Sequence, residues 1–160
     1  MTPESGKIKK RKLLRQRDTK EIIREVSELI DSKFESVEVV ELEGGYQIYF
    51  LDGTPELLRI DGTLYPTLKC RCIDNLPSVV IDMGAVPYIC NGADLMAPGI
   101  VKLNKDFVAG TIVIIKDERH GKSLAIGEAL LDSDGIRKVK KGKVIRNLHH
   151  VGDRFWKVYA

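Results

Sequence analysis

Apolar and polar positions divide the chain into a short helical region and a longer region of strands. Between residues 18 and 33, apolar side chains recur at helical spacing, at Ile22, Ile23, Val26, Leu29 and Ile30. This period predicts an amphipathic helix with one face packed on a sheet. Asp18, followed three positions later by Glu21, predicts the helix start as a capping box. The preceding basic residues, with Leu13 and Leu14, allow the helix to extend toward the N-terminus.

From residue 37 the apolar positions alternate with a period of two, which is typical of half-buried strands. Turn signals separate the expected strands at Gly44-Gly45, Asp52-Gly53 and Asp61-Gly62. Pro66 marks the end or the edge of a further strand. The first half is therefore predicted to be an α+β unit of one helix and an antiparallel sheet. Residues 1–6 are expected to be disordered.

The second half predicts a small, partly open, mainly-β barrel with one short helix. Residues 75–78 form the best linker, so we expect two domains, residues 1–77 and residues 78–160. A strand at residues 79–81 leads into one or two helical turns that end at Asn91-Gly92, and Pro98-Gly99 turns the chain into another strand. Later strands are expected at residues 111–115, 123–131, 143–148 and 155–159.

Positive charge is segregated along the chain, although the formal net charge is only +3. Residues 1–20 hold eight basic and two acidic residues, and residues 137–146 hold six basic residues and no acidic one. The remainder holds 12 basic and 21 acidic residues. Such segregation favours a polyanionic partner, whereas a solvated tail and an exposed β-turn are the structural alternative. No apolar run has the length of a membrane-spanning helix or a leader, so we expect a cytoplasmic protein without a membrane partner.

Candidate catalytic and metal motifs fail on spacing. Gly121-Lys122-Ser123 resembles the end of a phosphate loop, but Lys116 stands where the first glycine is required and a strand follows instead of a helix. A hairpin turn explains this segment better. Cys70 and Cys72 are separated by one residue, whereas zinc motifs use two to four. We expect both thiols to lie on a strand that faces the core, and we expect neither catalysis nor a cofactor.

Three other residues have plain structural interpretations. Cys90 is expected to be a small core residue. Asp82 and Asp94 flank the short helix, where helix capping and turn formation account for them. RNA binding fits the remaining features better: glycines that expose main-chain N–H groups, Tyr88 or Met96 as stacking surfaces, and the basic run. The alternatives are that Tyr88 is a core residue and that the glycines serve only tight packing.

Residues 79–160 resemble a PUA domain, an RNA-binding module. The motifs that carry the resemblance are Asp82 to Ala85, Asn91 to Asp94, Pro98 to Ile100, the hairpin at residues 121–127 and the ending from Asn147 to Trp156. The whole chain is similar to one branch, the malignant T-cell amplified sequence proteins, in an archaeal form. Tyr65 to Leu68 and Gly92 to Gly99 are specific matches to that branch. The expected fold is an α+β domain followed by a PUA pseudo-barrel.

The resemblance implies a role in translation, through binding of tRNA or small-subunit rRNA during initiation, reinitiation or recycling. It also implies a density-regulated type of translation factor as a partner. Carried onto this chain, the RNA-binding residues are Gly84, Ala85, Tyr88, Asn91, Gly92, Ala93, Met96, Pro98, Gly99, Lys102, Arg146, His149 and His150. The basic run adds Lys138, Lys140 and Lys141. Two alternatives stay open: a targeting subunit of a tRNA- or rRNA-modifying enzyme, and a protein-interaction adaptor with an exposed apolar patch around Tyr65-Pro66.

Overall fold

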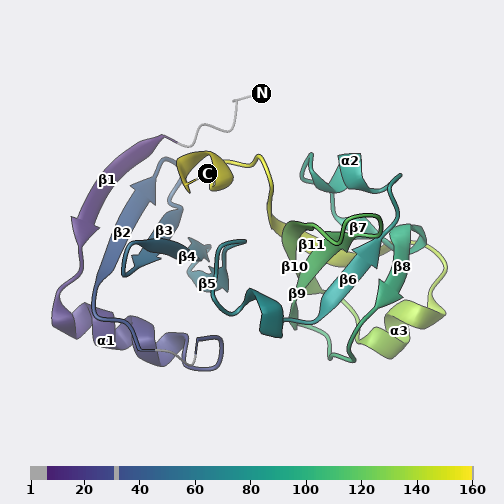
Figure 1. Cartoon of the computed structure of the whole chain (residues 1–160), viewed down its shortest axis with the longest axis horizontal. Helices are drawn as coiled ribbons and strands as arrows, with labels where there is room; N and C mark the ends of the chain where they lie inside the picture. Colours follow the sequence, from purple (N-terminus) through teal and green to yellow (C-terminus); the bar gives the residue numbers. More distant parts are fainter. Residues whose placement is uncertain (1–6, 31–32, 160) are drawn as a thin grey trace. The chain divides into compact units, whose positions relative to one another are not determined.

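The structure, a computed structural model, describes residues 7–30 and 33–159. The chain forms two compact units (Figure 1). The first unit contains the residues up to Asp74 together with Lys157–Tyr159, and the second contains Asn75–Trp156. The expected disorder of residues 1–6 lies outside the described residues. Within the described ranges, no helix is long and apolar enough to cross a membrane.

The first unit is a five-stranded antiparallel sheet whose strands follow one another in chain order (Figure 1). The strands are β1 (Ile8–Leu13), β2 (Val37–Leu42), β3 (Gln47–Leu51), β4 (Thr54–Ile60) and β5 (Thr63–Pro66). The predicted turns are confirmed: Asp52 and Asp61 have positive φ, as do the glycines that follow them, which is the backbone that tight hairpins need. Helix α1 (Gln16–Glu25) contributes buried Ile22 to a core that continues through β2 to β5.

Helix α1 differs from the predicted helix at both ends. It begins at Gln16 with Arg15 at the N-cap position, and no side chain caps it. Asp18 lies inside the first turn, where its carboxylate accepts a hydrogen bond from Arg15 Nε at 3.3 Å. The predicted capping box is therefore wrong. The helix ends at Glu25, although the apolar spacing continues, because Val26 departs from helical geometry at φ −106°.

The predicted N-terminal extension of the helix is also wrong, because Ile8–Leu13 forms strand β1. It pairs antiparallel with β2, and Lys12 lies opposite Val39. The main-chain bonds of this pairing outweigh the weak helical preference of a basic segment. All six residues of β1 are exposed, and the strand forms one edge of the sheet.

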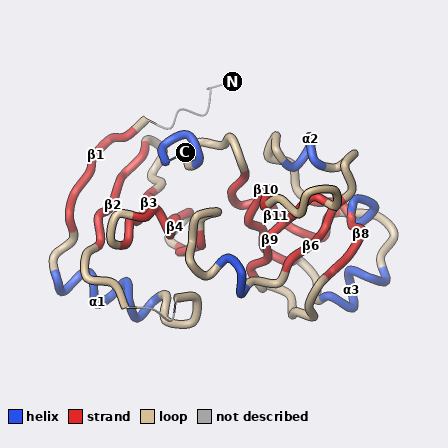
Figure 2. Tube along the Cα trace, in the orientation of Figure 1, coloured by secondary structure: helices blue, strands red, loops and turns tan. Residues whose placement is uncertain are grey.

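The second unit is a curled six-stranded sheet with short helices at its margins (Figure 2). Its strands are β6 (Ser78–Ile81), β7 (Leu95–Met96), β8 (Ile100–Leu103), β9 (Ile112–Asp117), β10 (Ser123–Ala129) and β11 (Lys143–His150). They are arranged in the order β7-β11-β10-β9-β6-β8, and only the pairing of β6 with β9 is parallel. The hairpin predicted at Gly121 is confirmed between β9 and β10. The fold class predicted from the sequence is confirmed in both halves.

Short helices account for the main errors in the second half. Helix α2 (Val86–Ile89) was expected, but α3 (Ser133–Lys138) was not. The segment predicted as a final strand contains a helical turn, α4 (Trp156–Tyr159). The carboxylate of Asp153 accepts a hydrogen bond from the N–H of Trp156 at 2.9 Å and thereby caps this turn. Two 3₁₀ turns, Ile73–Asn75 and Ala97–Gly99, complete the elements.

Candidate nucleic-acid interface

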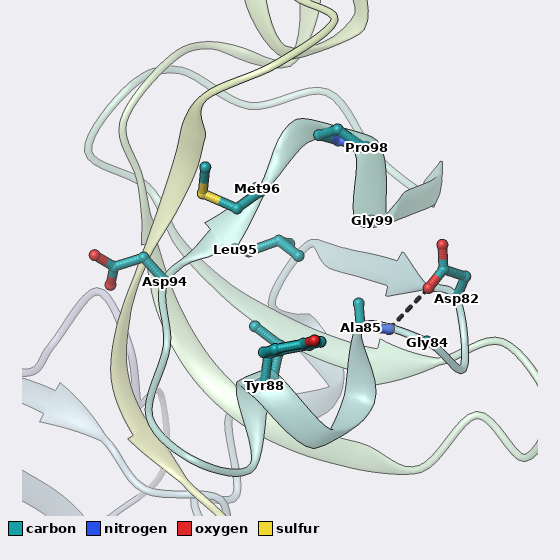
Figure 3. A pocket seen from close by; sticks show the side chains of 10 residues that line it. Asp82, Gly84, Ala85, Tyr88, Asp94, Leu95, Met96, Pro98 and Gly99 are labelled. Carbon is teal, nitrogen blue, oxygen red and sulfur yellow. Dashed lines mark hydrogen bonds between the residues drawn. The ribbon is translucent and has the colours of Figure 1, made fainter.

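A pocket of about 240 Å³ opens on the second unit where α2 faces the segment from Asp94 to Gly99 (Figure 3). Its lining is mostly small or apolar, with Ile89 and Leu95 buried within it, and it also includes the carboxylates of Asp82 and Asp94. Six residues predicted to contact RNA line this pocket: Gly84, Ala85, Tyr88, Met96, Pro98 and Gly99. The structure therefore brings the predicted glycine-rich segment together around one opening.

Local contacts hold α2 at the edge of the pocket. The carboxylate of Asp82 accepts a hydrogen bond from the N–H of Ala85 at 2.8 Å, just before the helix (Figure 3). Pro87 lies in the first turn, where its missing N–H has no helical partner to lose. After the helix, Gly92 has a φ of +92°, a backbone that favours glycine. The interpretation of Asp82 as a turn-forming residue is confirmed.

Two large side chains stand at the rim of the pocket and face solvent. Tyr88 on α2 is 70% exposed and Met96 on β7 is 46% exposed. Figure 3 shows them on opposite sides of the opening. The alternative of a core role for Tyr88 is wrong. Exposed aromatic and thioether groups beside a shallow apolar pocket form a surface on which a nucleobase can stack.

The floor of the pocket depends on a close approach of two main-chain segments. A Cβ atom built on Gly99 would lie 3.1 Å from Ala85 Cβ and 3.4 Å from Leu95 Cδ1. The turn that contains Gly99 therefore packs against the start of α2 without space for a larger residue. Any side chain at this position would have to displace the helix or its neighbours.

Asn147 on β11 fastens the segment that joins α2 to β7. Its Nδ2 donates hydrogen bonds to the carbonyl oxygens of Ile89 and Ala93, at 3.1 and 3.0 Å. Its main-chain N–H donates to Asp94 Oδ1 at 2.9 Å. Asp94 therefore has a structural role, but it bonds to β11 in place of the expected helix cap or turn, and its other oxygen lies 3.4 Å from Lys143 Nζ. Asn147 begins the closing motif of the resemblance, but its bonding role could not be predicted, because its partners are more than 50 residues away.

The basic run of residues 137–146 is not a single β-turn, because it covers the end of α3, a turn and the start of β11. Half of its cations have acidic partners in space. Arg137 lies 2.8 Å from a carboxylate oxygen of Asp106, and this contact raises the pKa of the guanidinium. Arg146 lies 3.1 Å from Glu128, and Lys143 pairs with Asp94. Charge counted along the sequence therefore overestimates the free positive charge of this segment.

The other cations of the run remain available to a polyanion. Lys138, Lys140 and Lys141 are exposed, and none has an ion-pair partner within residues 7–30 and 33–159. The same holds for Lys102 on β8, which also borders a groove between β8 and α3 together with Val101 and Val139. These lysines can neutralise phosphates at little desolvation cost.

The two histidines have different roles. His149 is fully buried, and its Nδ1 lies 2.8 Å from Asp153 Oδ2, so it cannot contact RNA directly and its predicted surface role is wrong. Burial raises the pKa of Asp153, but hydrogen bonds from His149 and from main-chain N–H groups outweigh burial and lower it. His150 is half-buried, and a Cβ atom built on Gly92 would lie 3.3 Å from its Nε2. Asn91, Gly92 and Ala93 are exposed in the adjoining loop.

The thiols are structural residues in this fold. Cys70 and Cys72 are buried in the core of the first unit, in a turn and not on the expected strand. Cys90 was predicted to be a core residue, but it is half-buried and packs against the core of the second unit from its margin. Among the residues that the structure describes, no group of three or more His, Cys, Asp or Glu side chains is placed to hold a metal ion.

Comparison with known proteins identifies both units. The sequence profile of the PUA domain matches residues 77–151, and that of a domain of unknown function, DUF1947, matches residues 10–71. An uncharacterized protein of Methanocaldococcus jannaschii is 36% identical over 159 residues, which cover 93% of this chain and 96% of that protein.

Two eukaryotic relatives are similar over most of the chain. Translation machinery-associated protein 20 of Saccharomyces cerevisiae is 33% identical, with 82% of this chain and 76% of that protein covered. Malignant T-cell-amplified sequence 1-B of Xenopus laevis is 31% identical, with 78% and 72% covered.

Solved structures give the same result. A hypothetical protein from Pyrococcus horikoshii superposes with a TM-score of 0.78 at 31% identity, covering 94% of this chain and 100% of that one. A PUA domain from Aeropyrum pernix, solved as a tartrate complex, gives 0.80 at 25% identity, covering 94% and 90%. The predicted PUA pseudo-barrel is thereby confirmed.

Proposed function

Because the chain belongs to the family of PUA-domain proteins that includes malignant T-cell-amplified sequence 1 and translation machinery-associated protein 20, we propose that it is a non-catalytic RNA-binding protein that acts in translation. Its ligand is structured RNA, either tRNA or small-subunit rRNA. It acts in the cytoplasm, in initiation, reinitiation or recycling, with a density-regulated type of factor as a partner.

The observation that carries this proposal is the pocket beside α2. Tyr88 and Met96 are large, exposed and placed on opposite sides of an opening lined mainly by apolar groups. Its two carboxylates, Asp82 and Asp94, each accept a hydrogen bond from a main-chain N–H. Such a site holds an unpaired nucleobase by stacking, and the exposed main chain around Gly84 and Gly99 permits close approach. The unpaired lysines at residues 138, 140 and 141 supply phosphate contacts on the same unit.

The interface is tested with the double variant Tyr88→Ala/Met96→Ala, measured by filter binding to tRNA and to purified small ribosomal subunits. Loss of one stacked base costs about 1–3 kcal/mol, so we expect affinity to fall roughly 10- to 100-fold. Val108→Ala/Leu130→Ala is the control, because it trims two exposed apolar side chains of the same unit outside the pocket. Equal affinity of the two double variants would refute the interface.

Charge reversal at Lys138, Lys140 and Lys141 tests the phosphate contacts. Each lost contact lowers the slope of log affinity against log salt by about 0.9 on duplex RNA, by analogy with duplex DNA. We expect a shallower slope and weaker binding to both probes. An unchanged slope would show that these lysines do not contact phosphate.

The adaptor alternative loses its main support. The apolar patch it requires around Tyr65-Pro66 is not exposed, because Tyr65 is only 8% exposed and Pro66 is buried. Affinity purification from cells separates the remaining alternatives. Recovery of small ribosomal subunits supports the translation role, and recovery of an RNA-modifying enzyme in their place supports a targeting subunit.

A further inference from the structure

Strand β1 gives the first unit a basic edge, which lies outside the PUA domain and has no part in the interface proposed above. Four of its six residues, Lys9 to Lys12, are basic, and all six residues are exposed. The strand pairs with β2 alone, so alternate main-chain N–H groups along it have no partner strand within the described chain. An exposed strand with unpaired N–H groups and cationic side chains presents two kinds of donor to an anion.

Only one of these cations is used to hold the strand in place. Arg11 lies 3.4 Å from Glu38 of β2, and its guanidinium lies 5.7 Å from the centre of the Phe50 ring on β3. Lys9, Lys10 and Lys12 have no ion-pair partner among the residues that the structure describes. Lys10 and Lys12 are two positions apart, so their side chains leave the same face of the strand about 6.6 Å from each other.

A pocket of about 240 Å³ adjoins this edge at the end of the β2–β3 hairpin. Lys9 lines it together with Tyr46, Gln47 and Gly45. The pairing register shifts between Ile8 and Lys10, so Lys9 is the extra residue of a β-bulge. A bulge turns a side chain out of the regular pleat, and here Lys9 lies in the pocket that Tyr46 also lines.

Glu41 is the carboxylate in the lining of this pocket, and it is partly engaged. Its Oε1 accepts a hydrogen bond from Gln47 Nε2 at 3.5 Å. The three lysines of β1 with Lys7 outnumber Glu41 and Glu43, the acidic residues that lie beside them, while Glu38 is paired with Arg11. The local charge favours an anionic ligand over a cationic one.

We propose that β1 and the Lys9–Tyr46 pocket form a second RNA-contact surface, which binds the backbone of a single strand and accepts a base beside Tyr46. Single-stranded nucleic acid is bound by a line of cations together with an aromatic platform, and both are present here. An acidic peptide would use the cations but would have no need of the aromatic pocket. The proposal rests on the RNA-binding function proposed above, but it concerns residues of the other unit.

The test compares two triple variants of the full chain that each remove three exposed cations of the first unit. The test variant carries Lys9→Gln, Lys10→Gln and Lys12→Gln, and the control carries Lys20→Gln, Arg24→Gln and Lys33→Gln. Each lowers the formal net charge from +3 to zero, so their overall electrostatics match. The probe is a fluorescein-labelled oligouridine of about 15 nucleotides, followed by anisotropy between about 50 and 200 mM salt.

We expect the test variant to bind about tenfold more weakly at low salt, and its salt slope to fall by about 2, since each single-strand phosphate contact contributes about 0.7. The control is expected to keep its slope. Equal losses in both variants would show general electrostatic attraction and overturn the proposal. So would equally tight binding of a fluorescein-labelled polyglutamate.

Crosslinking provides a readout that does not depend on charge. An oligouridine with 4-thiouridine substitutions is irradiated with the wild-type chain, and adducts are located by mass spectrometry. Adducts on Tyr46 or Lys9 support the proposal, and adducts confined to the second unit overturn it. Wild-type protein that binds neither tRNA nor ribosomal subunits refutes the proposed function. Wild-type protein that binds them normally, with the β1 variant equal to its control, refutes only the second surface.

Discussion

Asn147 offers the sharpest test of how the fold builds the pocket beside α2. Replacing it by alanine removes Nδ2, which donates to the carbonyl oxygens of Ile89 and Ala93. The main-chain bond from residue 147 to Asp94 remains, because it does not depend on the side chain. The variant therefore removes two of the three hydrogen bonds that residue 147 makes to the α2–β7 segment, without removing any group from the pocket lining.

The size of the effect follows from these bonds. A typical intramolecular hydrogen bond contributes about 0.5–1.5 kcal/mol, and a carbonyl left without a partner adds to the cost. The bond to Ala93 is exposed to solvent and contributes at the low end, while the bond to Ile89 is partly buried. We expect Asn147→Ala to lower the free energy of unfolding by about 2 kcal/mol, roughly a 30-fold change in the unfolding equilibrium.

Urea denaturation followed by circular dichroism measures this change, and tRNA binding measures its effect on the pocket. Asn104→Ala is the control, since it removes a single side-chain bond, from the N–H of Ser78 at 2.6 Å, outside the pocket. We expect both variants to lose stability, but only Asn147→Ala to weaken tRNA binding under conditions where both are folded. A loss of less than about 0.5 kcal/mol at Asn147, or equal tRNA affinities, would refute the reasoning.

Three further predictions concern stability. Glu56 is buried and accepts hydrogen bonds from Arg71, so Glu56→Ala should cost about 3–5 kcal/mol in urea denaturation. A Cβ on Gly127 would lie 2.5 Å from Ile145 Cγ2, so Gly127→Ala should cost about 1–3 kcal/mol, and less in an Ile145→Ala background. The pKa of Asp153 is lowered in the folded state, so its carboxylate stabilises the fold at pH values above the unfolded pKa of about 3.9. This stabilisation is lost as the pH falls through the folded pKa. The stability advantage of wild type over Asp153→Asn should therefore disappear in strong acid.

Each of these predictions has a clear contrary result. A Glu56→Gln variant as stable as wild type would show that shape and not charge matters at this site. A cost of Gly127→Ala that is the same with and without Ile145→Ala would exclude that methyl group as the cause. A constant difference between wild type and Asp153→Asn from neutral to acid pH would mean that the carboxylate contributes no charge-dependent stability.

Local turn chemistry explains why most strands of the first unit were predictable. Asp52-Gly53 and Asp61-Gly62 specify tight turns by themselves, and the strands on either side pair because the turn joins them. Strand β1 has no such signal. It forms because β2, more than 20 residues later, supplies main-chain partners, and a basic segment without apolar alternation does not reveal that pairing.

Two of the missed helices did have a signal in the sequence. Asp132 caps α3 through the N–H of Gly135 at 2.6 Å, and Asp153 caps α4. Both are aspartates just before a short helix. A helix of four or six residues is too short to show more than a fragment of a helical period, so its capping signal is easily overlooked. The apolar residues after Asp153 do not alternate as in a strand but lie at helical spacing, at residues 155, 156, 158 and 159, so the strand prediction overlooked the period as well as the cap.

The main-chain turns of the candidate site could be predicted from the sequence, but the side-chain contacts that hold them in place could not. The glycine and proline positions indicated where the backbone turns and where it exposes N–H groups. Neither the exposure of Tyr88 nor the contacts of Asn147 has a local signal, because both depend on how distant strands meet. The paired arginines of the basic run are a similar case, since their acidic partners are remote in sequence.

The strand order of the second unit determines when the pocket beside α2 can form during synthesis. Strands β1 to β5 pair in the order in which they are made, so the first sheet can form as the chain emerges. In the second unit, β7 has only β11 as a partner, and β11 is the last strand made. The α2–β7 segment therefore gains its hydrogen bond to residue 147 only after about 50 further residues have been synthesised. A chain interrupted before β11 would carry the strands of the complete first sheet but would lack the partner strand of β7 and the anchor of the pocket at Asn147.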